Sequence, residues 1–222
     1  MAADDRGGHD LAAYRDPDTC ILSKLIAHSD ADFTDATTTE RKWQWARPQV
    51  EGQGPCARGG HSATLVGPSD PSKASARIIL FGGHYDAGNG EFCYLSDTHI
   101  LDIDENTWYQ PRCRGTAPEA RYGHSAALVG TRVVYFGGKG KQKHFRDLHA
   151  LDSTSLTWYQ GPSSGGAPSA RQGHTATLHG TRLYVFGGSC GAKYFGDLHC
   201  LDLSSMAWSA PQTTGPKPSA RH

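Results

Sequence analysis

Short apolar runs, separated by Gly-rich and polar stretches, recur along this chain, and three of them close on Phe-Gly-Gly, as at Phe136-Gly137-Gly138. Apolar runs of this length between turn residues predict β-strands. In the most regular stretch the predicted strands are 124–129, 132–136, 148–151 and 157–160. The first two are apolar nearly throughout, which predicts sheets covered on both faces, and the later two alternate more, as expected nearer a rim.

Four landmarks recur in a fixed order, which marks an internal repeat. They are Pro-x-Ala-Arg followed by x-Gly-His, then Phe-Gly-Gly, then Asp-x-His-x-Leu-Asp, and finally a Trp. The repeated residues are Arg58, Arg121, Arg171 and Arg221; Gly82, Gly83, Gly137, Gly138, Gly187 and Gly188; Asp97, Asp147 and Asp197; and Trp108, Trp158 and Trp208, with Trp45 as the orphan of a preceding unit.

The repeat has a period of 50 residues between Arg121, Arg171 and Arg221, but Arg58 and Arg121 are 63 residues apart. The 13 extra residues fall in two places, around 67–76 and 84–96. Because insertions concentrate in loops, both segments are expected to be surface turns.

Composition fits an all-β chain and names no partner. Among 222 residues, 27 are Gly, and 22 Lys plus Arg balance 22 Asp plus Glu. A formal charge of zero provides no global field toward nucleic acid or an anionic membrane. The six Cys form no CxxC pair, so neither a zinc site nor a disulfide scaffold is indicated.

Residues 1–42 differ from the rest and are expected to be a polar, disordered leader, with a short amphipathic helix over 18–28 as the alternative. The N-terminus does not resemble a secretory signal, and no stretch approaches the ~20 apolar residues of a membrane helix. We therefore expect a cytoplasmic protein, with nuclear residence also open.

The period, the Gly doublet after an apolar strand, and the spaced Asp and Trp resemble kelch repeats, the blades of a β-propeller. The resemblance covers about residues 43–222, with units at about 53–110, 116–160 and 166–210 and the start of another at 216–222. It implies an all-β, kelch-type propeller of four-stranded blades. Since propellers typically have 4–8 blades, the ring is expected to be incomplete here, as in a fragment or isoform of a longer chain.

The repeated Arg and Asp could form a binding ring, but a group needed in every blade is expected to hold the blade together. Two sets of His recur, at 61, 124 and 174 and at 99, 149 and 199, and could in principle hold zinc or copper. Repetition favours a structural role for them as well, so no metal and no cofactor is predicted. No hydrolase, metalloprotease or nucleotide-binding motif is present, and no catalytic residue is predicted.

Residues that break the repeat are better candidates for function, and they lie between the second and third strands of each unit. Equivalent loops of a propeller emerge on one face, so these three could form one contact surface with aromatic anchors and a cationic patch. The candidate partner-binding residues are Tyr85, Phe92, Lys141, Lys143, Arg146 and Tyr194.

The leading hypothesis is a non-enzymatic scaffold, adaptor or effector that binds another protein through these loops, as the kelch resemblance implies. Self-association through open blade edges is a further expectation. The alternatives are an enzyme or metal-dependent protein on the same scaffold, and a nonfunctional fragment of a longer protein.

Overall fold

The computed structural model describes residues 46–67, 76–88, 90–161 and 166–221. The chain divides into two units, Met1–Gln49 and Val50–His222, and every strand described lies in the second. No α-helix occurs in these ranges, so none there is long and apolar enough to cross a membrane. The predicted leader and the orphan Trp45 lie outside the described residues.

The first sheet has five strands in the order β1-β7-β6-β3-β2. Its bounds are β1 (Glu51–Gly52), β2 (Ser62–Val66), β3 (Arg77–Phe81), β6 (Thr98–Asp102) and β7 (Thr107–Tyr109). The pairing is antiparallel except between β1 and β7, which run parallel. The four antiparallel strands make up the predicted blade.

The second and third sheets each have four antiparallel strands, in the orders β11-β10-β9-β8 and β12-β13-β16-β17. The second comprises β8 (Ser125–Val129), β9 (Arg132–Phe136), β10 (Leu148–Asp152) and β11 (Thr157–Gln160); the third comprises β12 (Thr175–His179), β13 (Arg182–Phe186), β16 (Leu198–Asp202) and β17 (Ala207–Ser209). The predicted strands of the second unit match these bounds to within one residue. The all-β prediction is therefore confirmed.

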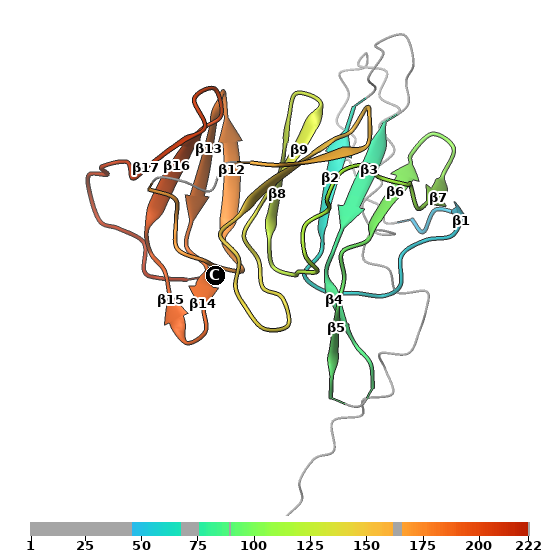
Figure 1. The fold of residues 1–222 in the computed structure, drawn as a ribbon, viewed down its shortest axis with the longest axis horizontal. Helices are drawn as coiled ribbons and strands as arrows, with labels where there is room; N and C mark the ends of the chain where they lie inside the picture. Colours follow the sequence, from blue (N-terminus) through green and yellow to red (C-terminus); the bar gives the residue numbers. More distant parts are fainter. Residues whose placement is uncertain (1–45, 68–75, 89, 162–165, 222) are drawn as a thin grey trace, which may run out of the picture. The chain divides into compact units, whose positions relative to one another are not determined.

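Two further hairpins project from the sheets: β4 (His84–Asp86) pairs with β5 (Phe92–Tyr94), and β14 (Ser189–Cys190) pairs with β15 (Lys193–Tyr194). In the second unit a single bridge between Lys139 and His144 takes their place. Figure 1 shows β4–β5 and β14–β15 at the same, lower end of the sheets. The insertion at 84–96, expected to be a surface turn, is thus a regular hairpin, whereas 68–75 lies outside the described residues.

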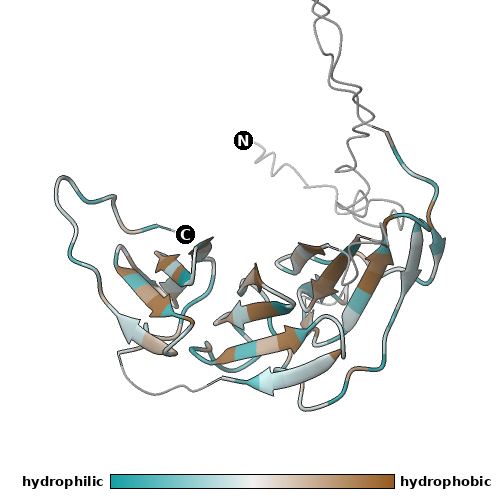
Figure 2. Ribbon diagram, turned by 90° about the horizontal axis from the view of Figure 1, so that it is seen from above, coloured by the Kyte–Doolittle hydropathy of each residue, from teal (hydrophilic) through white to brown (hydrophobic). Residues whose placement is uncertain are grey.

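The sheets pack face to face through two apolar cores, and Figure 2 shows them side by side with apolar residues on their strands. Phe81 and Ile100 of the first sheet pack with Tyr135 and Trp158 of the second. On the other face of the second sheet, Phe136 and its neighbours pack with the third. Because side chains alternate between faces, β9 serves both cores, with odd residues in one and even residues in the other.

Burial along the strands differs from the sequence prediction in one respect. The first strand of each unit was expected to be covered on both faces, but β8 is half-buried throughout and β12 alternates between exposed and half-buried. The third strands, β6 and β10, are more buried than expected. The reason is strand order: the first strand lies at the sheet edge, while the second and third lie between neighbours.

The first strands β2, β8 and β12 lie next to one another from sheet to sheet. Backbone hydrogen bonds connect the segments that lead into them, because Gly123 N donates to Gly60 O and Gly173 N donates to Gly123 O, both at 2.8 Å. The sheets are therefore joined along their inner edges by main-chain contacts as well as by apolar cores.

In the first two sheets the outer edge is covered by chain that precedes the sheet. Glu51 and Gly52 pair in parallel with Thr107 and Trp108 of the first sheet, and Arg114 bridges Thr157 of the second. Gly52 and the equivalent Gly115 have φ values of 77° and 72°, and a Cβ on either would collide with a Trp carbonyl. This outer pairing was not predicted from the sequence.

Candidate functional site

The repeated Arg and Asp residues form one network inside each sheet. Arg121 Nη1 and Nη2 donate to the two carboxylate oxygens of Asp147 at 2.6 and 2.9 Å, and Nη1 also donates to the Gly137 carbonyl at 2.9 Å. Arg121 is 1% exposed, and Phe145 lies against its guanidinium at 3.9 Å from the ring centroid. The arginine thus ties together the segments that precede the first strand, follow the second and precede the third.

The other two complete units repeat this arrangement with Arg58–Asp97 at 2.6 Å and Arg171–Asp197 at 2.7 Å. The pKa of each Asp lies below its usual range, and that of Asp197 is lowered to about 2. Burial alone would raise these pKa values. The charge and hydrogen bonds of the arginine, and a hydrogen bond with His99, His149 or His199, outweigh that effect. Because these guanidiniums are buried and both oxygens of each partially exposed carboxylate already accept hydrogen bonds, the pairs have little bonding capacity left for a ligand.

Two histidines of the other set, His124 and His174, make contacts between sheets. His124 Nε2 shares a hydrogen bond with Ser62 Oγ of the preceding sheet, and His174 Nε2 shares one with Ser125 Oγ, each at 2.9 Å. Burial, and then the nearby arginines, lower the pKa of His124 to about 3 and that of His174 to about 4. These two imidazoles are therefore uncharged near neutral pH, and each links its sheet to the preceding one by a hydrogen bond.

The Gly doublets and the tryptophans also join neighbouring sheets. Gly83 N donates to Arg121 O and Gly138 N to Arg171 O, both at 2.8 Å. Trp158 packs on Phe81 of the preceding sheet at 5.0 Å between ring centroids, and Trp208 packs on Phe136 at 5.1 Å. Within the described ranges, no cluster of three or more His, Cys, Asp or Glu residues could hold a metal ion.

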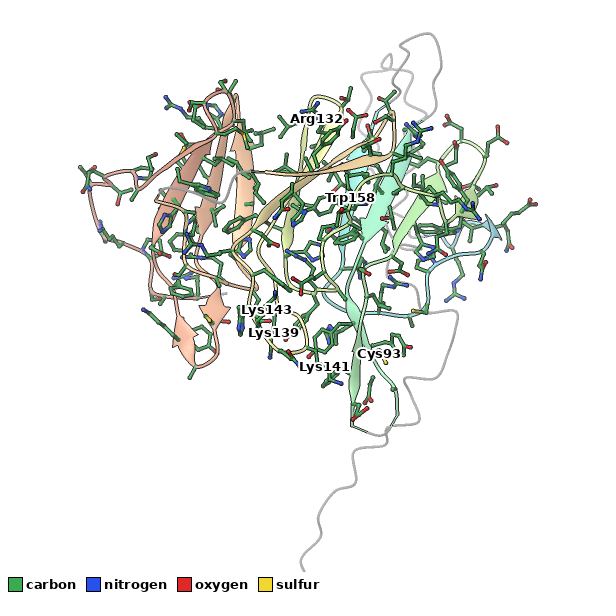
Figure 3. All side chains as sticks on the ribbon, viewed as in Figure 1. Cys93, Arg132, Lys139, Lys141, Lys143 and Trp158 are labelled. Atoms are coloured by element: carbon green, nitrogen blue, oxygen red, sulfur yellow. The ribbon has the colours of Figure 1, made fainter. Side chains whose placement is uncertain are left out.

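The residues that break the repeat lie at one end of the sheets, on a surface we call the hairpin face: segments 84–94, 139–146 and 189–195. Figure 3 shows Lys139, Lys141, Lys143 and Cys93 at this end and Arg132 at the opposite end. The three candidate loops thus lie at the same end of the sheets.

The β4–β5 hairpin separates two of the candidate residues. Because strand side chains alternate, Tyr85 shares one side of the hairpin with Cys93, whereas Phe92 shares the other with His84. A hydrogen bond with Cys93 is the main reason that the pKa of Tyr85 is raised. Tyr85 and Phe92 are both exposed, but they cannot contact the same small surface.

Phe92 belongs to an aromatic cluster formed by His84, Phe92, Tyr94 and Tyr122. The His84 ring lies 5.1 Å from Phe92 and 4.3 Å from Tyr122, and Tyr94 lies 5.7 Å from Tyr122. Burial lowers the pKa of His84, which favours its neutral form in this cluster. Phe92 remains 51% exposed and is the most accessible ring of the cluster.

Tyr122 also belongs to this surface, although it was not among the predicted partner-binding residues. It occupies the variable position between Arg and Gly in the Arg-x-Gly-His motif, where the other units have Gly59 and Gln172. Variation at one position of an otherwise fixed motif was the available signal. Its contact with His84 could not be foreseen, because it depends on how adjacent units pack.

The segment 139–146, which we call the cationic segment, contains Lys141, Lys143 and Arg146, all exposed. Lys143 Nζ forms an ion pair with Glu119 Oε1 at 2.7 Å, so its charge is neutralised locally. Phe145, which could have been an aromatic anchor, is instead 5% exposed beneath Arg121. In the third hairpin, Phe195 is likewise buried against Arg171, and Tyr194 is 52% exposed.

Comparison with known proteins gives a consistent result. The model of the KLHDC2/KLHL20/DRC7 Kelch-repeats domain matches residues 28–222. The chain is 37% identical to the Rab9 effector protein with kelch motifs of Xenopus laevis over 84 residues, 38% of this chain and 21% of that protein. It is 34% identical to Kelch domain-containing protein 3 of Bos taurus over 94 residues, 42% of this chain and 22% of that protein.

Acyl-CoA-binding domain-containing protein 5 of Arabidopsis thaliana is 35% identical over 94 residues, 42% of this chain and 13% of that protein. The matches thus span about a fifth or less of the length of these relatives. Among solved structures, that titled "Structure of YjhT" superposes with a TM-score of 0.60 at 14% identity, over 80% of this chain and 58% of that chain. At this identity the likeness establishes the propeller fold alone.

Proposed function

This chain belongs to the kelch-repeat family, and on that premise we propose that it is a non-enzymatic module that binds another protein through the hairpin face. One observation carries the proposal: the segments that break the repeat, 84–94, 139–146 and 189–195, project from the same end of three repeated sheets. A repeated scaffold with variable segments at one end can present a specific surface without altering its core.

The chemistry of the face supports binding of a protein. Phe92 and Tyr194 are large, half-exposed aromatic residues of the two hairpins, and Lys141 and Arg146 are exposed cations of the segment 139–146. Aromatic and Arg residues dominate the energetics of protein interfaces. The name of the Xenopus relative describes an effector, which also favours a role in recognition.

Site-specific photo-crosslinking tests this proposal. A photoreactive phenylalanine analogue replaces Phe92 on the hairpin face or, as the matched control, Arg132 at the opposite end. We expect a discrete protein adduct from position 92 and not from position 132 in extracts of cells that express the protein. Adducts from position 132 alone, or from neither position, would contradict the proposal.

Self-association through an open sheet face is a second proposal, favoured by the third sheet. Phe81 and Phe136 are fully buried between sheets, whereas Phe186 at the equivalent position is only half-buried. A second copy packed on this face would remove apolar surface from water. Sedimentation should then show a mass that rises with concentration and falls back in Phe186→Ser; a constant monomer mass would disprove it.

A further inference from the structure

The cationic segment is a local departure from the scaffold. It contains four cations, Lys139, Lys141, Lys143 and Arg146, and no acidic residue. The equivalent stretch of the third unit, 189–196, has one Lys, and 84–96 in the first unit has no Lys or Arg. Because the other two units fold without these charges, the blade does not require them.

The four cations differ in how far their charge is already compensated. Lys143 is paired with Glu119, and its Nζ also lies 5.2 Å from the centroid of the Phe145 ring. Within the described part of the chain, no carboxylate forms an ion pair with Lys139, Lys141 or Arg146. The charge available to a ligand therefore comes from these three residues.

The aromatic cluster adjoins this charge through main-chain contacts. Tyr122 exchanges two backbone hydrogen bonds with Lys139, at 3.0 and 2.9 Å, and its ring is 4.3 Å from His84, which in turn contacts Phe92. An apolar surface thus continues directly into a cationic one. Figure 3 shows the labelled lysines at the same end as Cys93 of the β4–β5 hairpin.

We propose that the partner segment bound here is an extended acidic peptide that carries an aromatic or aliphatic side chain among its carboxylates. The exposed Lys141 and Arg146 and the half-buried Lys139 pair with the carboxylates, and Phe92 and Tyr122 hold the apolar side chain. This proposal rests on the proposed function. Charge complementarity selects the acidic partner, and the aromatic cluster selects the apolar side chain.

Nucleic acid fits the same surface less well. Affinity for nucleic acid depends on neutralising a row of phosphates, and the compensating charge here is confined to one segment of a chain with no net charge. Three ring contacts in the cluster are edge-on or tilted, and His84 stacks on Tyr94 with 6.3 Å between centroids, so the rings do not form a row of parallel faces on which successive bases could stack.

Fluorescence anisotropy with the full chain tests this inference. The probe is a short labelled peptide of Asp and Glu around one Phe, compared with its Asn/Gln counterpart. We expect the acidic probe to bind more tightly and to weaken as the salt concentration is raised.

The variants distinguish the available from the compensated charges. An exposed ion pair contributes a factor of roughly 1.4 to 5 in affinity, so Lys141→Gln with Arg146→Gln should weaken binding about tenfold. The matched control Lys143→Gln should weaken it less than about twofold, and all variants should keep the melting temperature of the parent. Replacing the probe's Phe by Ala should weaken parent binding severalfold and leave Phe92→Ala unaffected.

Equal binding of the acidic and neutral peptides, or an equal effect of Lys143→Gln and Lys141→Gln, would overturn the inference. So would tighter binding of a single-stranded oligonucleotide than of the acidic peptide. Failure here together with a protein adduct at position 92 leaves the proposed function intact, whereas absence of that adduct removes the proposed function whatever the peptides do.

Discussion

At the scale of single residues, buried charge is concentrated in Arg121 and Arg171, which are 1% and 0% exposed. Each guanidinium bonds a carboxylate in a bidentate manner and a backbone carbonyl as well. The sequence supported a structural role for these residues, because a contact needed in every unit recurs in every unit. It could not show which carbonyl or ring completes the bonding.

Replacing Arg121 tests that role. Arg121→Ala leaves Asp147 and the Gly137 carbonyl without their main partner, and removal of one member of a buried pair costs about 3–5 kcal/mol. We expect a loss of about 3 kcal/mol in the free energy of unfolding, measured by urea denaturation. Arg132→Ala is the control, since its contact with Asp152 is 3.6 Å long and exposed, and should cost under about 1 kcal/mol. Full stability of Arg121→Ala with lost partner binding would instead identify a binding ring.

For the buried Tyr135, in contrast to Arg121, we expect that removing the polar group does not reduce stability. The residue is 1% exposed between the first and second sheets, and its hydroxyl has no hydrogen-bond partner among the described residues. Burial raises the pKa of this phenol, so the group stays neutral. Tyr135→Phe removes an unsatisfied polar group and should leave stability unchanged or raise it by about 1 kcal/mol. Loss of more than about 1 kcal/mol on thermal or urea unfolding would mean that the hydroxyl has a partner, such as a buried water.

At the scale of elements, the strands were predictable and the connections between them were not. The predicted strands of the second unit follow from apolar runs and turn residues, which are local signals. By contrast, the β4–β5 hairpin lies in an insertion with alternating polar and aromatic residues, and the outer pairing of β1 depends on residues far along the chain. For the candidate site, the variable segments could be located from the sequence. The register of the β4–β5 hairpin, which places Tyr85 and Phe92 on opposite sides, could not.

The second Gly of each doublet lies where the backbone of another segment approaches too closely for a side chain. Gly138 has a φ of 98°, and a Cβ there would lie 2.9 Å from the Tyr122 carbonyl oxygen. Gly130 also has a positive φ, 58°, but a Cβ there would meet open space. Both Ala variants incur backbone strain of about 1 kcal/mol, and Gly138→Ala adds a steric clash. Thermal unfolding should therefore show a clearly larger loss for Gly138→Ala than for Gly130→Ala; equal losses would mean that the neighbouring segment moves aside.

At the scale of the whole molecule, the repeat was sufficient to predict an all-β propeller of four-stranded blades, because every blade repeats the same landmarks. The order of burial across a blade required the structure, since it depends on which strand lies at an edge. Contacts between sheets are equally a property of the assembly: His124 meets Ser62 and Trp158 meets Phe81 only when adjacent blades pack.

The two histidines that connect adjacent sheets, His124 and His174, predict that the free energy of unfolding decreases at acidic pH. The pKa values of His124 and His174 are lowered to about 3 and about 4 in the folded protein, against about 6.5 when unfolded. The unfolded chain therefore binds more protons between these values, and the stability contribution, present in full above pH ~6.5, falls as pH is lowered through that window. At pH ~5 the loss is about 2 kcal/mol for each histidine.

Urea unfolding at pH ~7 and ~5 measures this loss. His124→Gln should shrink the difference between the two pH values, whereas the control His179→Gln, on exposed β12, should leave it unchanged. An undiminished pH dependence in His124→Gln would show that other groups govern the effect. Asp197, with a pKa of about 2, adds a separate loss only below pH ~4, because its charged form stabilises the fold.

The parallel pairing of β1 with β7 has a consequence for how the protein is made. Glu51 pairs with Thr107, which leaves the ribosome 56 residues later, and Arg114 pairs with Thr157, 43 residues later. At synthesis rates of about 5–20 residues per second, the outer partner of each of these two sheets waits roughly 2 to 11 seconds for its strand to emerge. These two blades are therefore completed from inside outward, and the last edge of each is closed by chain that was translated first.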